Sequence, residues 1–98
     1  MGFYYFKIKI MKDWHLYVLR NPKGILYTGI SKDTARRVDE HNSGTGAKFT
    51  RGRGPWIMAY SEGPFEHGDA LRREIAIKKD SKLKVQLKQI VAPPKSAS

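Results

Sequence analysis

Apolar and polar positions alternate or recur along this chain in ways that divide it into strands and helices. Two segments rich in aromatic and β-branched residues, 14–20 (WHLYVLR) and 25–31 (ILYTGIS), predict neighbouring strands. The segment 56–61 (WIMAYS) predicts a third strand. The spacing of apolar residues and the end signals predict three helices, at 33–43, 68–80 and 81–91. The pattern therefore predicts a mixed domain of strands and helices.

The turn between the first two strands determines how they pair. Residues 21–24 (NPKG) have the chemistry of a type I turn followed by a left-handed glycine, which predicts a three-residue hairpin loop with a bulge. Tyr17 then lies opposite Gly29, and Leu19 lies opposite Tyr27, so that both tyrosines share one face of the hairpin. A two-residue loop would instead place the two phenol rings on opposite faces.

The helix at 33–43 has signals at both ends: Ser31 or Asp33 can cap its beginning, and Gly44 can end it. The glycine-rich segment 43–54 (SGTGAKFTRGRG) predicts a loop. Within 81–91, apolar residues again recur at helical spacing.

The two ends of the chain differ in character from the middle. Residues 1–12 predict an N-terminal extension, either flexible or with an edge strand over 4–10, where apolar and polar residues alternate. The tail 92–98 predicts disorder, and 13–91 predicts one domain. The N-terminus resembles neither a signal peptide nor a myristoylation site, so the expected location is cytoplasmic by default.

Composition narrows the function classes. The chain has 98 residues and a formal net charge of +10, with no cysteine. It is long enough for one small domain, has no apolar run of the ~20 residues that a transmembrane helix needs, and cannot form disulfides or a cysteine zinc site. A small body with this charge attracts polyanions. Nucleic acid is the favoured partner over an anionic membrane surface, because the charges are spread rather than gathered on one amphipathic helix or terminal block.

One carboxylate stands out by its position. Glu74 shares a helical side with Ala70, Leu71 and Ile77, where a lone carboxylate is costly unless it is paired or binds a cation. An ion pair with Lys78, four residues later, is the structural explanation. The functional explanation is a ligand for a divalent metal such as Mg²⁺, which one or two protein carboxylates typically hold together with water and phosphate.

Four further side chains are candidates for chemistry. Tyr17 and Tyr27 can be packing residues of a sheet or can act on a proton, and Gly29 between the strands marks a close approach. Arg37 is either a solvated helix residue or a planar fork suited to phosphate. His41, four residues later and on the same helix face, either interacts with the helix dipole or transfers a proton near neutral pH.

Taken together, these residues resemble the GIY-YIG nuclease domain. The first signature strand appears as residues 15–17 (HLY) and the second as 27–29 (YTG), while Arg37, His41 and Glu74 match the family's arginine, histidine and metal-binding glutamate. The resemblance covers about residues 13–90, and the HNSGTGAKFTRGRGP and ALRREIAIK stretches are similar to the short stand-alone bacterial YhbQ-like branch. The first triplet keeps only its tyrosine, the family's frequent asparagine after the glutamate has no clear counterpart, and no separate DNA-binding domain is recognised.

The resemblance implies a fold and an activity. The fold is α/β (α+β), with a small three-stranded, mainly antiparallel sheet flanked by helices. The activity is metal-dependent endonucleolytic hydrolysis of DNA, in repair, recombination or related processing. Glu74 would hold one Mg²⁺ (or Mn²⁺), and Arg37 would hold the phosphate. Tyr17 or Tyr27 would orient or deprotonate the attacking water, and His41 would assist proton transfer.

The glycine-rich loop adds a second group of candidates. Lys48, Arg51 and Arg53 can neutralise backbone phosphates, and Phe49 or Trp56 can stack on an unpaired base. The structural explanation is a flexible, solvated loop. Three alternatives to the DNA endonuclease stay open: a nucleic-acid-binding module without catalysis, a nuclease subunit that needs a protein partner for targeting, and RNA as the substrate.

Overall fold

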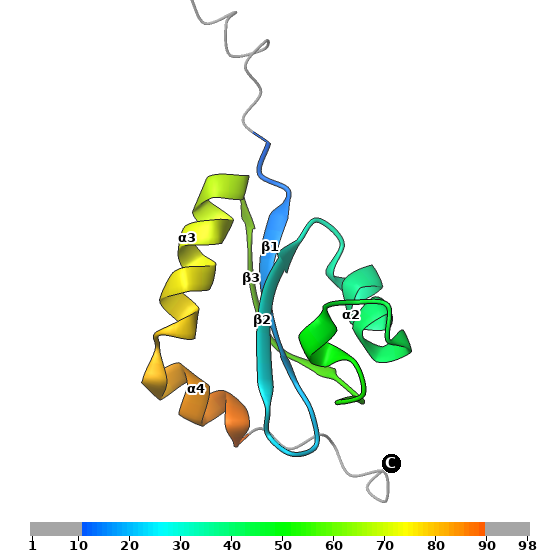
Figure 1. The fold of residues 1–98 in the computed structure, drawn as a ribbon. Coiled ribbons are helices and arrows are strands. Elements are labelled where there is room, and N and C mark those ends of the chain that lie inside the picture. Colours follow the sequence, from blue (N-terminus) through cyan, green and yellow to red (C-terminus); the bar gives the residue numbers. More distant parts are fainter. Residues whose placement is uncertain (1–10, 90–98) are drawn as a thin grey trace, which may run out of the picture.

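The computed structural model describes residues 11–89, which form a three-stranded antiparallel sheet with helices on both faces (Figure 1). The sheet order is β2-β1-β3, so β1 is central and both of its neighbours pair with it antiparallel. The predicted fold class is confirmed. The elements in chain order are β1 (Trp14–Arg20), β2 (Leu26–Ser31), α2 (Thr34–Ser43), the 3₁₀ turn η1 (Lys48–Thr50), β3 (Ile57–Phe65), α3 (His67–Lys78) and α4 (Ser81–Lys88).

The β1–β2 hairpin has the register that its turn residues predict. Tyr17 pairs with Gly29, and Leu19 pairs with Tyr27. The side chain of Asn21 holds the turn together, because its Oδ1 accepts from the backbone N–H of Ile25 at 2.8 Å and from that of Lys23 at 3.0 Å. Gly24 has a φ of 81°, as the left-handed position after the type I turn requires. The two phenol rings therefore lie on the same face of the hairpin, and the alternative register is wrong.

The third strand, β3, pairs with β1 and is longer than predicted. The predicted strand ends at residue 61, whereas β3 continues to Phe65. The Gly63-Pro64 dipeptide suggests a turn in the sequence, yet β1 reaches back to Trp14, and Trp14 pairs with Phe65. The length of the partner strand thus decides where β3 ends.

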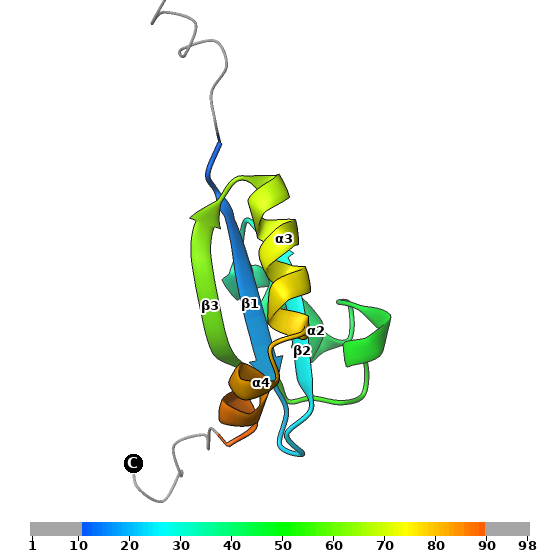
Figure 2. The same cartoon turned by 90° about the vertical axis from the view of Figure 1, so that its left-hand side faces the viewer.

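The two faces of the sheet carry different cores because successive residues of β1 point to opposite sides. Leu16 and Val18 pack with Ile77 and Leu87 beneath α3 and α4. On the other face, Tyr17 and its neighbours pack towards α2. Figure 1 shows the sheet nearly edge-on between α2 and the α3–α4 pair, and Figure 2 shows α3 and α4 in front of the sheet.

The helix ends follow capping chemistry. Asp33 caps α2 by accepting from the N–H of Arg36, and Gly44 ends it at a φ of 84°; both were predicted as end signals. The predicted helix 68–80 instead ends at Lys78, because Asp80 is the N-cap of α4 and its Oδ1 accepts from the N–H of Leu83. The described part of the last helix ends at Lys88.

Three other expectations have different outcomes. The segment 43–54 is mostly loop, but it contains the unpredicted turn η1. The edge strand proposed at 4–10 and the tail 92–98 lie outside the described residues, and the domain limits stay a prediction. Among the described helices, none combines the length and the apolar character that crossing a membrane demands.

Candidate active site

The hairpin brings Tyr17 and Tyr27 to the α2 face, with ring centroids 6.4 Å apart. Tyr17 is only 1% exposed, and its ring crosses over Gly29 on the neighbouring strand. A Cβ atom at Gly29 would lie 2.6 Å from the Tyr17 hydroxyl oxygen. The close approach that the glycine signals is therefore made by a side chain of the protein itself, and the missing Cβ lets the Tyr17 hydroxyl reach α2.

That hydroxyl contacts a buried histidine. The Tyr17 hydroxyl oxygen lies 2.9 Å from Nε2 of His41, which is in the last turn of α2 and is 2% exposed. The rings of Tyr17 and Tyr27 lie 6.0 and 4.9 Å from the His41 ring, measured between centroids. Two strands and one helix thus bring three titratable rings into one cluster.

The other nitrogen of His41 determines which way the protons point. Nδ1 lies 2.7 Å from Oγ1 of Thr50, and that hydroxyl donates to the carbonyl of Ala47 at 2.8 Å. Because the Thr50 proton is committed to the carbonyl, Nδ1 carries the hydrogen and donates to Thr50. The backbone N–H of Ala47 also points at Nδ1 and would need Nδ1 to be the acceptor, but at 3.4 Å it is the weaker of the two contacts. Nε2 is consequently the acceptor, and the Tyr17 hydroxyl donates to it.

Burial keeps the side chains of Tyr17 and His41 uncharged at neutral pH. It lowers the pKa of His41, which the positive charge of Arg37 lowers further while Glu40 opposes. It also raises the pKa of Tyr17 to about 12, and the neighbouring Tyr27 adds to that rise, while Arg37 acts against it. At neutral pH, Tyr17 is therefore a hydroxyl donor and His41 an unprotonated acceptor.

Arg37 lies one turn before His41 on α2. Its Nη1 pairs with Oε1 of Glu40 at 2.8 Å, and the hydrogen bond to Glu40 raises the pKa of the guanidinium. The side chain is partly exposed. The positive charge of Arg37 also acts to lower the pKa of Tyr17. A cation with free N–H groups thus stands beside the Tyr17–His41 pair.

Glu74 comes from α3, on the other side of the sheet from α2. Its side chain is 20% exposed, and Oε2 lies 3.3 Å from Nζ of Lys78, so the ion pair considered from the sequence is present. The negative charge of Glu74 is the smallest of the causes that act on the pKa of Tyr17, and it raises that pKa. The predicted apolar surround is partly wrong: Ala70 and Ile77 are buried, but Leu71 is 40% exposed.

Within residues 11–89, no group of three or more histidine, aspartate or glutamate side chains is arranged to hold a metal ion. A divalent ion at Glu74 would therefore have one protein carboxylate as its ligand. This donor set fits Mg²⁺, which keeps several waters and completes its coordination with substrate phosphate, and it does not fit a metal held entirely by protein.

The loop residues are placed unevenly around this cluster. The Phe49 ring, 46% exposed, stacks on Tyr27 at 6.1 Å between centroids. The guanidinium of Arg53 lies 4.7 Å from the Phe49 ring centre and donates to the Phe49 carbonyl at 2.8 Å. Lys48 and Arg51 are exposed. The loop therefore delivers Phe49 and Arg53 to the edge of the site, while Lys48 and Arg51 face solvent.

Trp56 corrects one expectation. It is 2% exposed, and its indole N–H donates to the carbonyl of Thr50 at 3.0 Å. The backbone N–H and C=O of Trp56 are both bound by the side chain of Asn42. Trp56 is thus a core residue that holds η1 and α2 against β3, and it is unable to stack on a base in this position.

Sequence reasoning missed three residues that support the cluster. Thr50 anchors His41, and Glu40 holds Arg37. Gly46 passes so close to His41 that a Cβ there would lie 2.5 Å from Nδ1. Glu40 had a signal, since it is three residues after Arg37 on a helix. Thr50 and Gly46 had none, because their partner is brought to them by the path of the loop.

The chain is similar in sequence to a known protein family and to several of its members. The sequence matches the GIY-YIG catalytic domain over residues 13–87. The UPF0213 protein of Serratia proteamaculans is 42% identical over 86 residues, which are 88% of this chain and 82% of that protein. The UPF0213 protein of Aeromonas hydrophila is 45% identical over 69 residues, covering 70% of this chain and 51% of that protein. The solution NMR structure of the UPF0213 protein BH0048 from Bacillus halodurans is 37% identical and covers 76% of this chain and 80% of that chain, with a TM-score of 0.46.

The match over 13–87 defines the class of protein: a nuclease-type catalytic domain, whose substrate class is nucleic acid and whose members generally use divalent metals. The chain belongs to the GIY-YIG family, as its two signature strands predicted. The UPF0213 protein of Serratia proteamaculans confirms the predicted resemblance to the short bacterial branch of that family.

Proposed function

We propose that the protein is a metal-dependent endonuclease that hydrolyses phosphodiester bonds of DNA. The proposal is carried by the hydrogen bond from Tyr17 to His41 within electrostatic reach of both Arg37 and Glu74. Hydrolysis of a phosphodiester needs a base for the attacking water, charge neutralisation at the non-bridging oxygens and help for the leaving oxygen. The GIY-YIG match supports this reaction class.

Tyr17 and His41 supply the base as a pair. Because burial raises the pKa of Tyr17 to about 12, the phenol alone is a poor base for neutral pH. As the Tyr17 oxygen takes a proton from the attacking water, its own proton passes to the unprotonated Nε2 of His41 at 2.9 Å. Thr50 holds the ring in the tautomer that can accept it. Tyr27 forms no hydrogen bond through its hydroxyl within residues 11–89, and its role is to orient the water.

Arg37 binds the scissile phosphate. Its planar guanidinium can donate to two oxygens at once, and only one of its donors is used by Glu40. Glu40 therefore fixes the fork while leaving donors for the substrate. The same guanidinium stabilises negative charge on Tyr17 during proton transfer, as its lowering effect on the Tyr17 pKa indicates.

Glu74 holds the metal. A single carboxylate suits one Mg²⁺ or Mn²⁺ ion. Metal binding would break the partly exposed ion pair between Glu74 and Lys78, which stabilises the protein by about 0–1 kcal/mol. When bound, the ion neutralises charge on the phosphate and at the leaving oxygen. A nucleic-acid substrate is favoured by the net charge of +10 and by Phe49 and Arg53 at the edge of the site. A role in repair or recombination, a cytoplasmic location and a targeting partner stay predictions.

The test is cleavage of supercoiled plasmid DNA by the purified protein. We expect nicked and then linear plasmid with Mg²⁺ or Mn²⁺, and no cleavage when the metal is chelated. Glu74→Gln should abolish cleavage, whereas Asp39→Asn, which removes the same charge from an exposed site on α2, should not. Arg37→Ala should also abolish cleavage, with Arg36→Ala, its exposed neighbour, as the control.

Two results would contradict the proposal. Binding of DNA without cleavage in either metal would favour the non-catalytic binding module. Cleavage that survives Glu74→Gln would assign the activity to another site or to a contaminating nuclease. A structured RNA, tested in parallel with the plasmid under the same conditions, decides between DNA and RNA as the substrate.

A further inference from the structure

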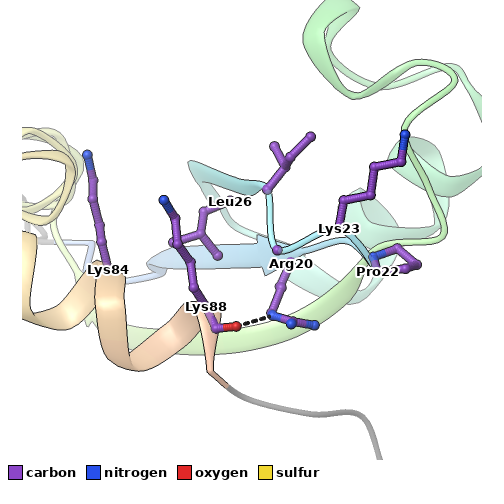
Figure 3. A pocket seen from close by; sticks show the side chains of 8 residues that line it. Arg20, Pro22, Lys23, Leu26, Lys84 and Lys88 are labelled. Carbon is purple, nitrogen blue, oxygen red and sulfur yellow. Dashed lines mark hydrogen bonds between the residues drawn. The ribbon is translucent and has the colours of Figure 1, made fainter.

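A basic groove lies at the turn end of the β1–β2 hairpin, where α4 packs beside it (Figure 3). Its volume is about 570 Å³, and four of its eight lining residues are cations while none is an anion. The candidate catalytic side chains are not among them. The lining residues are Arg20, Pro22, Lys23, Gly24, Ile25, Leu26, Lys84 and Lys88.

The floor of the groove is fixed by Arg20. Its Nε donates to the backbone carbonyl of Lys88 at 3.1 Å, and its Nη1 donates to the carbonyl of Asn21 at 3.3 Å. These bonds tie the end of β1 to the last turn of α4. The groove therefore has a defined shape, because its two walls, the hairpin turn and the helix, are joined through one side chain.

The other three cations are available to a ligand. Lys84 and Lys88 are one turn apart on the same side of α4, and Lys23 comes from the hairpin turn. In the view of Figure 3, Lys84 and Lys88 lie to the left of Arg20, and Lys23 lies to its right. None of the three lysines forms an ion pair with any residue between 11 and 89 (the six ion pairs there involve other cations). Their charge is consequently uncompensated by the described protein.

The groove connects with the edge of the candidate active site. A second cavity of about 360 Å³ shares Pro22, Lys23 and Ile25 with it and is also lined by Arg53. Arg53 lies over the ring of Phe49, which stacks on Tyr27 in the catalytic cluster. Cationic side chains thus follow one path from the cluster, through Arg53 and Lys23, to α4.

We propose that this groove binds the sugar-phosphate backbone of the nucleic-acid substrate beyond the cleaved phosphodiester, with Lys23, Lys84 and Lys88 as the phosphate contacts. The inference rests on the proposed function and extends it by naming a second binding surface. A groove between two walls admits a narrow polyanion, whereas a planar bilayer contacts only its rim. Continuity with Arg53 and Phe49 also favours the same ligand for both surfaces.

The experiment compares two double variants that lose the same charge. Lys84→Ala/Lys88→Ala removes groove lysines, and Lys79→Ala/Lys82→Ala removes exposed lysines of the α3–α4 region that do not line it. Binding of a fluorescent DNA duplex is measured by anisotropy over a salt series, with Ca²⁺ in place of Mg²⁺. Each lost phosphate contact lowers the slope of log K against log salt by about 0.9, so the groove variant should lose about 1.8 and the control less than about half of that.

Cleavage measured in parallel with Mg²⁺ separates this inference from the proposed function. If the groove binds substrate, Lys84→Ala/Lys88→Ala raises KM for plasmid DNA and leaves kcat unchanged. Equal slopes and equal affinities for the two double variants would overturn the groove, whether or not the protein cleaves DNA. Loss of the slope in the groove variant, with no cleavage by any form of the protein, would support the groove and overturn the nuclease.

Binding to vesicles that contain an anionic phospholipid tests whether the groove lysines bind a membrane surface instead of nucleic acid. The groove proposal predicts weaker binding to vesicles than to the duplex at equal salt, with the same modest loss for both double variants. Vesicle binding that depends on Lys84 and Lys88 while duplex binding does not would overturn the proposal in favour of a membrane surface. Circular dichroism of both double variants checks that α4 is retained, which is expected because alanine favours helices.

Discussion

The two faces of the sheet are built from alternate residues of the same strand, yet they differ in chemistry. Leu16 and Val18 enter a wholly apolar core under α3 and α4. One position along, Tyr17 enters a face whose buried groups include the imidazole of His41 and the hydroxyl of Thr50. The first face holds the helices in place, and the second holds a chain of hydrogen bonds.

This difference indicates which face carries function. An apolar face gains stability from burial alone, whereas buried polar groups cost free energy unless each finds a partner. On the α2 face every member of the chain is satisfied: Tyr17 donates to His41, His41 to Thr50, and Thr50 to Ala47. Such a satisfied network adds little stability over an apolar core, but it fixes a tautomer and an orientation. In the proposed function, the α2 face is therefore the one that moves a proton.

The largest expected effect is a loss of stability when a side chain is removed from the apolar face. Leu16→Ala deletes a fully buried side chain from the apolar face and should lower the free energy of unfolding by about 3 kcal/mol, measured by chemical denaturation. The tautomer of His41 in the folded protein should stay unchanged, because Leu16 points away from Tyr17. Leu71→Ala, at an exposed site, is the control and should change stability by less than about 0.5 kcal/mol. A changed His41 tautomer in folded Leu16→Ala, measured by imidazole nitrogen chemical shifts, would show that the two faces are not independent.

The next effect is at the crossing of the two strands. Gly29→Ala places a Cβ 2.6 Å from the Tyr17 hydroxyl oxygen, so the ring must move away from His41. Overpacking of this kind costs about 2 kcal/mol, and cleavage should fall with it. Gly68→Ala, where the nearest atom lies 3.6 Å from the new Cβ on a helix, should instead be neutral or stabilising. An active and stable Gly29→Ala protein would mean that the Tyr17 position is not needed.

A smaller effect tests the anchor of His41. Thr50→Val keeps the shape but removes the hydroxyl between His41 Nδ1 and the Ala47 carbonyl, at an expected cost of about 1 kcal/mol. Thr50→Ser keeps the hydroxyl and serves as the matched control. Nitrogen chemical shifts of the imidazole report the tautomer: the wild type and Thr50→Ser should carry the hydrogen on Nδ1, and Thr50→Val should show a mixture. The same mixture in wild type would remove the argument for Nε2 as the acceptor.

The sequence predicted the features that depend on local chemistry. The turn at 21–24 set the hairpin register, and with it the shared face of Tyr17 and Tyr27. Asp33 and Gly44 bounded α2 because capping depends on only a few adjacent residues. His41 followed Arg37 onto the same helix, so their proximity needed no tertiary information.

Features that depend on distant parts of the chain were beyond local patterns. Trp56 reads as a surface aromatic next to a glycine-rich loop, but Asn42, on another element, holds it in the core. Thr50 reads as a loop threonine until the loop folds back on His41. Leu71 reads as apolar and inward-facing, yet the elements around α3 leave it 40% exposed. In each case the partner lies on an element whose position only the fold determines.

The smallest effect is a pH dependence that belongs to the α2 face alone. Burial lowers the pKa of His41 below its ordinary value of 6.5, so the unfolded chain binds this proton more readily than the folded protein does. The unfolding free energy therefore rises with pH in this window: the contribution of neutral His41 is present above about pH 6.5 and is lost as the pH falls through the lowered pKa. Thermal unfolding between about pH 7.5 and 5.5, above the range where carboxylates titrate, measures it. His41→Gln should flatten the dependence of thermal stability on pH. Leu16→Ala should lower the stability equally at every pH in this range. An unchanged pH dependence in His41→Gln would assign it to another group.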